Sequence, residues 1–155
     1  MKKLFYLFLL LPFSLLISCS DDKDFSPVDM TLTLDGVTQS GDTFYTISGE
    51  SVSLENFVVK SIDGKTSTVT NLTFYFNGVP LIGTPGNPFM GTFTTEDIPA
   101  GNYAINVTGN LLQVDSSIKI FTVNYPLTIV KSSEDLPAGA PDLGSYSQTI
   151  RVSND

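Results

Sequence analysis

The chain has 155 residues, which is enough for one ordinary domain with a short appendage. Its 16 acidic residues outnumber its 8 basic residues, for a formal net charge of −8, and Arg151 is the only arginine. Nucleic-acid binding needs a basic stripe, and forked recognition of phosphate or carboxylate needs arginine, so this composition argues against a nucleic-acid partner and against such anion sites.

Residues 1–18 have the composition of a signal peptide. Lys2 and Lys3 form a charged end, and residues 4–17 form an apolar run of 14 residues that Pro12 interrupts. A membrane-spanning helix needs about 20 apolar residues, so this run is too short to cross a bilayer and fits an export signal.

Cys19, the only cysteine, follows this run directly. A disulfide needs a second cysteine, and a zinc site needs several thiolate or imidazole ligands, whereas this chain has no histidine. Residues 16–19, Leu-Ile-Ser-Cys, resemble the lipobox of bacterial lipoproteins. The resemblance implies cleavage before Cys19, lipidation of its thiol and acylation of the new amino terminus, which together make a stable membrane anchor. A free structural cysteine is the alternative.

Residues 19–28 are expected to form a lipidated acidic tether, because charged and small polar residues cannot build a core. They lack the twelve-residue loop with its closing glutamate that binds calcium, so no metal is expected. Ser20, Asp21 and Asp22, followed by Asp24, resemble the surface-export signal of lipoproteins from the Bacteroidota. This resemblance implies a lipid-anchored protein of the outer membrane that faces the cell exterior. A plain disordered tether is the alternative.

The rest of the chain predicts β-strands, because short runs of alternating apolar and polar residues are separated by Gly, Pro, Asn and Asp. Residues 31–34 alternate in this way and end at Asp35-Gly36, where a turn is expected. This alternation gives each strand one face that contacts solvent, which favours an antiparallel sandwich. No segment after the signal peptide has the helical period of apolar residues together with capping residues, so no α-helix is expected. The expected core positions are Leu54, Leu72, Phe74, Tyr103, Ile105, Val107, Ile118 and Ile120.

Three segments, in chain order, resemble the immunoglobulin-like family. Residues 49–54 (Gly-Glu-Ser-Val-Ser-Leu) are similar to its B strand, residues 74–81 to its C strand with the following turn, and residues 99–110 to its E–F corner and F strand. The resemblance implies an immunoglobulin-like antiparallel β-sandwich over residues 29–124.

The same resemblance assigns roles to three core residues. Phe74 stands where the family has its core tryptophan, and Ile105 stands at the cysteine position of the F strand, so the domain would be a disulfide-free relative. Tyr103 would form a tyrosine corner, in which the phenol hydroxyl bonds to backbone upstream.

The C-terminal part, residues 125–155, is expected to be a β extension packed on the sandwich. Residues 133–139 (Ser-Glu-Asp-Leu-Pro-Ala-Gly) repeat the pattern of residues 95–101 (Thr-Glu-Asp-Ile-Pro-Ala-Gly), and Gly-x-Tyr follows at Gly144 as it does at Gly101. The repeat indicates either a duplicated corner or an ordinary loop composition. Residues 126–130 and 146–152 are expected to pair as a hairpin or to extend a sheet edge.

No enzyme is expected. The absence of histidine excludes imidazole-based triads, and the glutamates are too few and too loop-bound to argue for a pair of facing catalytic carboxylates. Asp63-Gly64-Lys65 is interpreted as a turn. No cofactor and no metal are expected.

Two classes of function remain. The first is a non-catalytic interaction or adhesion module at the cell surface, which binds an envelope or extracellular protein through loops expected at residues 83–89 and 109–115 or through the tail. The second is similar to the glycan-binding accessory lipoproteins of polysaccharide-uptake systems. Sugar binding favours exposed aromatic platforms, for which Tyr45, Tyr75 and Phe89 are the candidates. The alternative is that Tyr75 only occupies the outer face of a sheet.

Overall fold

The computed structural model describes residues 25–81, 91–114 and 116–153. Within these residues the chain forms nine β-strands, one 3-10 helix and no α-helix, which confirms the all-β prediction. In chain order the elements are β1 (Val28–Ser40), β2 (Thr43–Ile47), β3 (Ser51–Ser61), β4 (Ser67–Phe76), β5 (Val79–Leu81), β6 (Gly91–Thr94), β7 (Gly101–Gln113), β8 (Lys119–Val130), the helix η1 (Ser133–Asp135) and β9 (Gly144–Val152). The predicted signal peptide and the candidate residues Cys19, Ser20, Asp21, Asp22, Asp24 and Phe89 lie outside the described residues.

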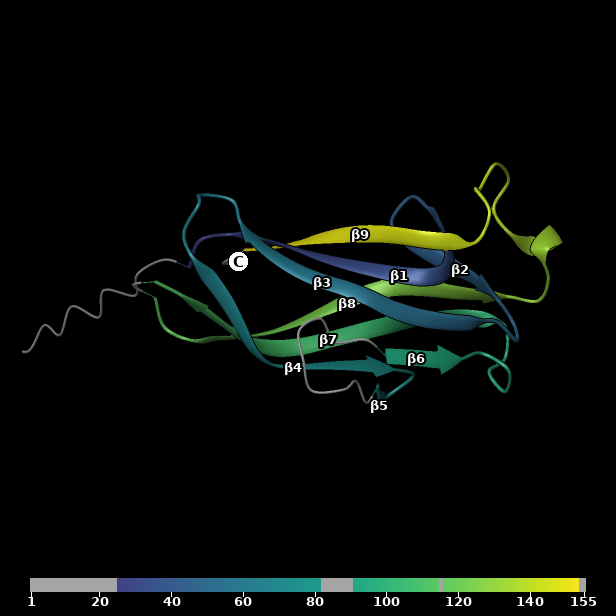
Figure 1. Ribbon diagram of the computed structural model, residues 1–155, viewed down its shortest axis with the longest axis horizontal. Coiled ribbons are helices and arrows are strands. Elements are labelled where there is room, and N and C mark those ends of the chain that lie inside the picture. The colour runs from purple at the N-terminus through teal and green to yellow at the C-terminus, as the bar shows by residue number, and fades with distance from the viewer. Residues whose placement is uncertain (1–24, 82–90, 115, 154–155) are drawn as a thin grey trace, which may run out of the picture.

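The nine strands belong to one mixed sheet. They follow the order β5-β4-β7-β8-β2-β1-β3-β6, and β9 pairs with β1 beside this path (Figure 1). Every pair is antiparallel except β2 with β8, which run parallel. The two ends of the path approach each other where Phe76 of β4 stacks on Phe93 of β6, with ring centroids 4.3 Å apart. The sheet is therefore nearly closed and barrel-like.

β1 joins the two sides of this sheet because it bends at Gly36. Residues up to Asp35 pair with β3, and residues from Thr38 onward pair with β2. Gly36 has a φ of +80°, and the Thr46 hydroxyl donates a hydrogen bond of 2.9 Å to its carbonyl oxygen. The expected turn at Asp35-Gly36 is therefore wrong. The glycine does adopt positive φ, but pairing on both sides keeps the flanking residues in one strand.

The core contains four of the expected positions, namely Leu54, Phe74, Ile105 and Val107, and two more, Leu72 and Tyr103, are partly buried against it. The expectation for Ile118 and Ile120 is wrong, because these side chains are 63% and 78% exposed. Ile118 precedes β8, and Ile120 has the outward parity of that strand. A run of four residues cannot define the inward face of a strand, which is set here by the longer series Phe121, Val123, Tyr125, Leu127 and Ile129.

Tyr125 is the largest of the fully buried side chains, and its role was not foreseen from the sequence. Its hydroxyl donates a hydrogen bond of 2.7 Å to the carbonyl oxygen of Met30, which ties β8 to β1 across the core. Burial raises the pKa of this phenol well above its ordinary value, so the group is neutral at physiological pH.

The C-terminal segment extends a sheet edge. β9 pairs with β1 along its length and does not pair with β8, so the edge alternative is confirmed for residues 146–152 and the hairpin alternative is wrong. Residues 126–130 do not extend an edge, because they belong to β8, which lies between β7 and β2. The predicted boundary between residues 124 and 125 lies inside β8, which continues to Val130. The physical reason is that every second side chain of β8 points into the core on both sides of this boundary, so the strand does not end there.

Two corners of the fold are built in the same way. Tyr103 is the third residue of β7, and its hydroxyl donates a hydrogen bond of 2.7 Å to the carbonyl oxygen of Pro99. Tyr146 is the third residue of β9, and its hydroxyl donates one of 2.9 Å to the carbonyl oxygen of Asp142. Each strand begins with glycine, and each acceptor lies four residues upstream. The Gly-x-Tyr repeat is therefore a structural repeat, while residues 133–135 form η1.

Tyr103→Phe and Tyr146→Phe should each lower the free energy of unfolding by about 1 kcal/mol, because each removes one hydrogen bond to a backbone carbonyl. The two sites do not share a partner, so the double variant should lose the sum of the two values. Urea unfolding followed by circular dichroism measures these changes. An unchanged midpoint for either single variant would show that its corner bond is not needed for stability.

Candidate functional site

The outer surface of strands β2, β4, β7 and β8 carries no charged side chain. Strands β2, β4, β5 and β7 contain no Asp, Glu, Lys or Arg, and β8 contains only Lys119. The Lys119 ammonium lies 4.5 Å from the centre of the Phe25 ring and does not point to this surface. We call this surface the uncharged face; its polar members are Tyr45, Thr73, Tyr75, Asn102, Asn106, Thr108, Asn110, Thr122, Asn124 and Thr128, and its apolar members include Ala104, Ile120 and Pro126.

The strand register arranges these side chains in rows across the sheet. In one row Tyr75 of β4 lies between Pro80 of β5 and Asn106 of β7, and Asn106 lies beside Asn124 of β8. Strands lie about 4.8 Å apart, so a row over four strands is about 14 Å long. The face is therefore wide enough for an extended ligand.

Two further rows flank the first. Thr73, Thr108 and Thr122 lie side by side on β4, β7 and β8. On the other flank, toward β2, Ala104 lies opposite Pro126, and beyond them Asn102 lies opposite Thr128, which lies opposite Tyr45. Tyr75 and Tyr45 thus stand at opposite margins of a surface composed mostly of amides and hydroxyls.

Some polar side chains of the uncharged face form hydrogen bonds with one another. The Asn106 Nδ2 group donates to Asn124 Oδ1 at 2.5 Å, and the Thr128 hydroxyl donates to Asn102 Oδ1 at 3.0 Å. Both bonds are exposed. Each asparagine amide has several donor and acceptor positions, so groups on Asn106, Asn124 and Asn102 still face solvent.

The opposite surface, formed by β1, β3 and β9, has different chemistry. Arg151 Nε donates to Asp29 Oδ1 at 2.9 Å, and this hydrogen bond lowers the pKa of Asp29 below its ordinary value. The hydroxyls of Thr31 and Thr149 lie 2.7 Å apart in a hydrogen bond. Its charged side chains, among them Asp29 and Arg151, distinguish this surface from the uncharged face.

The candidate binding residues fall into three groups. Tyr45 and Tyr75 are half-buried members of the uncharged face, and Phe89 lies outside the described residues, as do residues 83–89. Residues 109–113 are not a loop, because they belong to β7. A Cβ atom at Gly109 would lie 2.9 Å from the Phe121 ring, so this glycine permits close packing in a strand and does not mark a turn.

Sequence reasoning missed the asparagines and threonines of the uncharged face. It treated the outward positions of each strand only as solvent-facing. The absence of charge in β2, β4, β5 and β7 was the available signal, since exposed strand positions ordinarily include charged residues.

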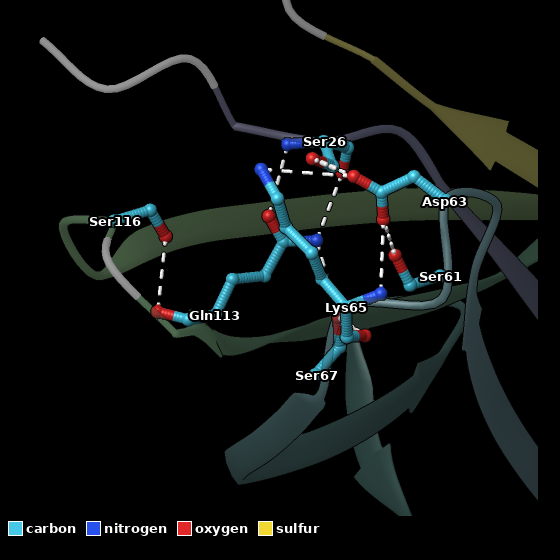
Figure 2. A network of polar contacts seen from close by, with 7 residues as sticks. All are labelled: Ser26, Ser61, Asp63, Lys65, Ser67, Gln113 and Ser116. Atoms are coloured by element: carbon cyan, nitrogen blue, oxygen red, sulfur yellow. Dashed lines mark hydrogen bonds and ion pairs between the residues drawn. The ribbon is translucent and has the colours of Figure 1, made fainter.

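A second polar site lies where the chain enters the fold (Figure 2). The Gln113 side chain exchanges two hydrogen bonds of 2.9 Å with the Ser26 backbone, since its Oε1 accepts from Ser26 N and its Nε2 donates to Ser26 O. Phe25 is buried beside it, with 8% of its surface exposed. The fold therefore holds the chain from Phe25 onward. The expected tether of residues 19–28 is wrong for residues 25–28, because Phe25, Ser26 and Val28 are buried and β1 begins at Val28.

Asp63 completes this second site from the connection between β3 and β4. Its carboxylate accepts hydrogen bonds of 2.6 Å from the hydroxyls of Ser26 and Ser61 and one of 3.1 Å from the Lys65 backbone (Figure 2). These bonds, the one from Ser26 foremost, hold the pKa of Asp63 well below its usual range. The residue expected only to shape a turn also ties the start of the fold to this connection.

Asp63→Asn should lower the melting temperature at pH 7 and weaken its dependence on acid pH. The folded-state pKa of Asp63 lies below the unfolded value of about 3.9, so its contribution is present above that pH and is lost as pH falls further. Melting curves between pH 7 and pH 2 measure the effect.

Asp97→Asn is the matched control, because the Asp97 carboxylate makes no hydrogen bond within the described ranges. The melting temperature of this control should follow the wild-type pH profile. Equal acid sensitivity in the wild type and Asp63→Asn would contradict the assigned role of Asp63.

A scan against protein-family models and a search of curated proteins find no match to this chain. In residues 25–81, 91–114 and 116–153, no three His, Cys, Asp or Glu side chains are grouped so as to hold a metal ion. None of the helical structure in those ranges is long and apolar enough to cross a membrane.

Proposed function

We propose that this chain is a lipid-anchored module of the bacterial outer membrane that faces outward and binds a partner without catalysis. The observation that carries this proposal is the uncharged face, a broad ordered surface of amides, hydroxyls and tyrosines in an otherwise acidic chain. Such a surface has groups for recognition, whereas the chain has no histidine and its single thiol, on Cys19, would be lipidated. The partner is an envelope or extracellular protein, or alternatively a glycan.

The anchor rests on the resemblance of residues 16–19 to a lipobox and of Ser20, Asp21 and Asp22 to a surface-export signal. The site around Ser26 supports this arrangement, because the fold holds the chain six residues after Cys19. Six residues reach at most about 20 Å, which would keep the domain close to the membrane. The β3–β4 and β7–β8 connections would lie nearest to it, at the same end of the long axis as the start of β1 (Figure 1).

The scaffold is proposed to be a disulfide-free immunoglobulin-like sandwich whose two layers are joined by the bend of β1 at Gly36. The strand neighbours support it: β3, which resembles the B strand, pairs with β1 and β6, and β4, which resembles the C strand, pairs with β5 and β7. The bond from Tyr103 to Pro99 has the form of a tyrosine corner.

Cys19→Ala should abolish acylation and leave the protein unprocessed or released from the membrane. Replacement of Asp21, Asp22 and Asp24 with Ala should preserve lipidation but remove surface exposure. Mass spectrometry of the amino terminus and protease digestion of whole native-host cells measure these outcomes. An intact Met1 terminus on the mature wild-type protein would refute the anchor, and unchanged protease access in the triple variant would refute the export role.

Binding through the uncharged face is tested separately from anchoring. Purified residues 20–155 are immobilised and exposed in turn to envelope proteins and to polysaccharides of the host's surroundings. Thr108→Lys places a charge in the central strand of the uncharged face, and Thr31→Lys is the matched change in the central strand of the opposite surface. Binding should be lost only in Thr108→Lys. Binding that survives Thr108→Lys in a folded protein would refute the role of this face.

A further inference from the structure

We propose that the uncharged face binds a chain of a neutral polysaccharide. This inference rests on the proposed function and names its ligand. The ligand would lie across β4, β7 and β8, on the rows that contain Tyr75, Asn106 and Asn124 and, beside them, Thr108 and Thr122.

The charge distribution selects a neutral ligand. The chain has 16 acidic and 8 basic residues, yet neither kind stands on this face. A polyanion would find no cation there, and a cationic partner would find no carboxylate. Burial of an unpaired charge is costly, so an acidic or basic ligand would lose affinity on contact with these strands.

The polar groups of the face match a ligand made of hydroxyls. A sugar hydroxyl both donates and accepts hydrogen bonds, and so do the asparagine amide and the threonine hydroxyl. The bond from Asn106 to Asn124 holds the two amides side by side while leaving further donor and acceptor positions toward solvent. An ordered row of this kind can contact successive hydroxyls of one chain.

Tyr75 supplies the apolar contact that sugar rings need. It is half-buried in β4, with Pro80 on one side and Asn106 on the other. A tyrosine ring offers a flat apolar surface to the C–H groups of a pyranose at low conformational cost. Binding sites for small ligands commonly combine such aromatic surface with a few well-placed polar groups.

A protein partner or a second copy of this chain fits less well. Stable protein interfaces place large apolar, aromatic or arginine side chains at their centre and polar groups at the rim. Here the centre contains Asn106, Thr108, Thr122 and Asn124 beside the small apolar pair Ala104 and Pro126, whereas the large apolar side chain Ile120 stands toward one end. The arrangement is opposite to that of a protein interface.

The size of the face predicts a preference for chains over single sugars. A row over four strands is about 14 Å long, and the distance from Asn102 to Thr108 along β7 is about 20 Å. A monosaccharide would cover only a small part of this area. Affinity should therefore rise with the length of the oligosaccharide.

Affinity electrophoresis tests the inference with purified residues 20–155. Native gels contain dextran, soluble starch, galactomannan or arabinoxylan as neutral probes, and polygalacturonate as an anionic probe. At least one neutral polysaccharide should retard the wild-type protein, and polygalacturonate should not. Calorimetric titration with oligomers of the retarding polysaccharide should show affinity that increases with length.

Tyr75→Ala and Asn106→Ala should each weaken this binding by about tenfold, since each removes one principal contact. Ser147→Ala on β9 is the control and should bind like the wild type, because it lies on the opposite surface. Thermal melting confirms that the variants are folded.

Retardation by no neutral polysaccharide, retardation by the anionic one alone, or binding unaffected by Tyr75→Ala and Asn106→Ala would each overturn the inference. A protein ligand, or dimerisation seen by sedimentation, that is abolished by Thr108→Lys would overturn the glycan ligand and leave the proposed function standing. If no ligand of any class depends on this face, both proposals fail.

Discussion

Phe74→Ala should lower the free energy of unfolding by about 3–5 kcal/mol. The Phe74 side chain is only 3% exposed and points into the core from β4. Its ring lies edge-on to that of Phe57, with centroids 5.7 Å apart, so truncation removes both buried apolar surface and a favourable aromatic pair. Urea unfolding followed by tyrosine fluorescence or circular dichroism measures the change.

Ile120→Ala is the matched control for this prediction. Ile120 is also a large apolar residue in a strand, but its side chain is 78% exposed on β8. Its truncation should change stability by no more than about 0.5 kcal/mol. A loss in Ile120→Ala as large as that in Phe74→Ala would show that β8 faces the other way.

Gly36→Ala should lower the free energy of unfolding by at least about 3 kcal/mol, for two reasons that add. The residue has a φ of +80°, a conformation that alanine adopts only with strain. In addition, a Cβ atom there would lie 2.2 Å from the carbonyl oxygen of Ser51, which is backbone and cannot rotate away. Because β1 and β3 approach each other here, the substitution should force the two strands apart.

Gly64→Ala separates these two causes. Gly64 has a φ of +79°, nearly the same as Gly36, but a Cβ atom there would meet nothing within 4 Å. Its substitution should cost about 1–2 kcal/mol, from backbone strain alone. The difference between the two variants, measured by urea unfolding, reports the contact between β1 and β3. Equal losses would show that the strands tolerate the extra atom.

The local pattern of apolar and polar residues was enough to predict much of the fold. Alternation within each run was enough to predict an all-β domain and to assign Phe74 and Ile105 to the core, because a strand with one wet face must have a period of two. The short motif around Tyr103 was also informative, since the hydroxyl reaches a carbonyl only four residues away. Interactions between residues close in sequence can be inferred without knowledge of the rest of the chain.

The predictions from sequence were wrong where the structure depends on packing between strands that are far apart in the sequence. Ile120 faces solvent because the long inward series of β8 sets the parity of the whole strand, and the short run around it gives no such information. Gly36 and Gly109 resembled turn glycines, but both lie inside strands, where neighbouring backbone or the Phe121 ring comes too close for a side chain. Such close approaches depend on how strands from separate segments pack.

The sequence by itself determined that the chain is all-β, which faces of most strands are wet, and that β2, β4, β5 and β7 carry no charge. These are properties of single strands, which follow from the alternation of side chains and from composition. Only the tertiary structure decided that β2 runs parallel to β8 and that β9 lies beside β1, since backbone hydrogen bonds allow any strand to pair with any other. The uncharged face belongs to this second class. Its residues come from separated segments, and only the registers of β4, β7 and β8 bring Tyr75, Asn106 and Asn124 into one row.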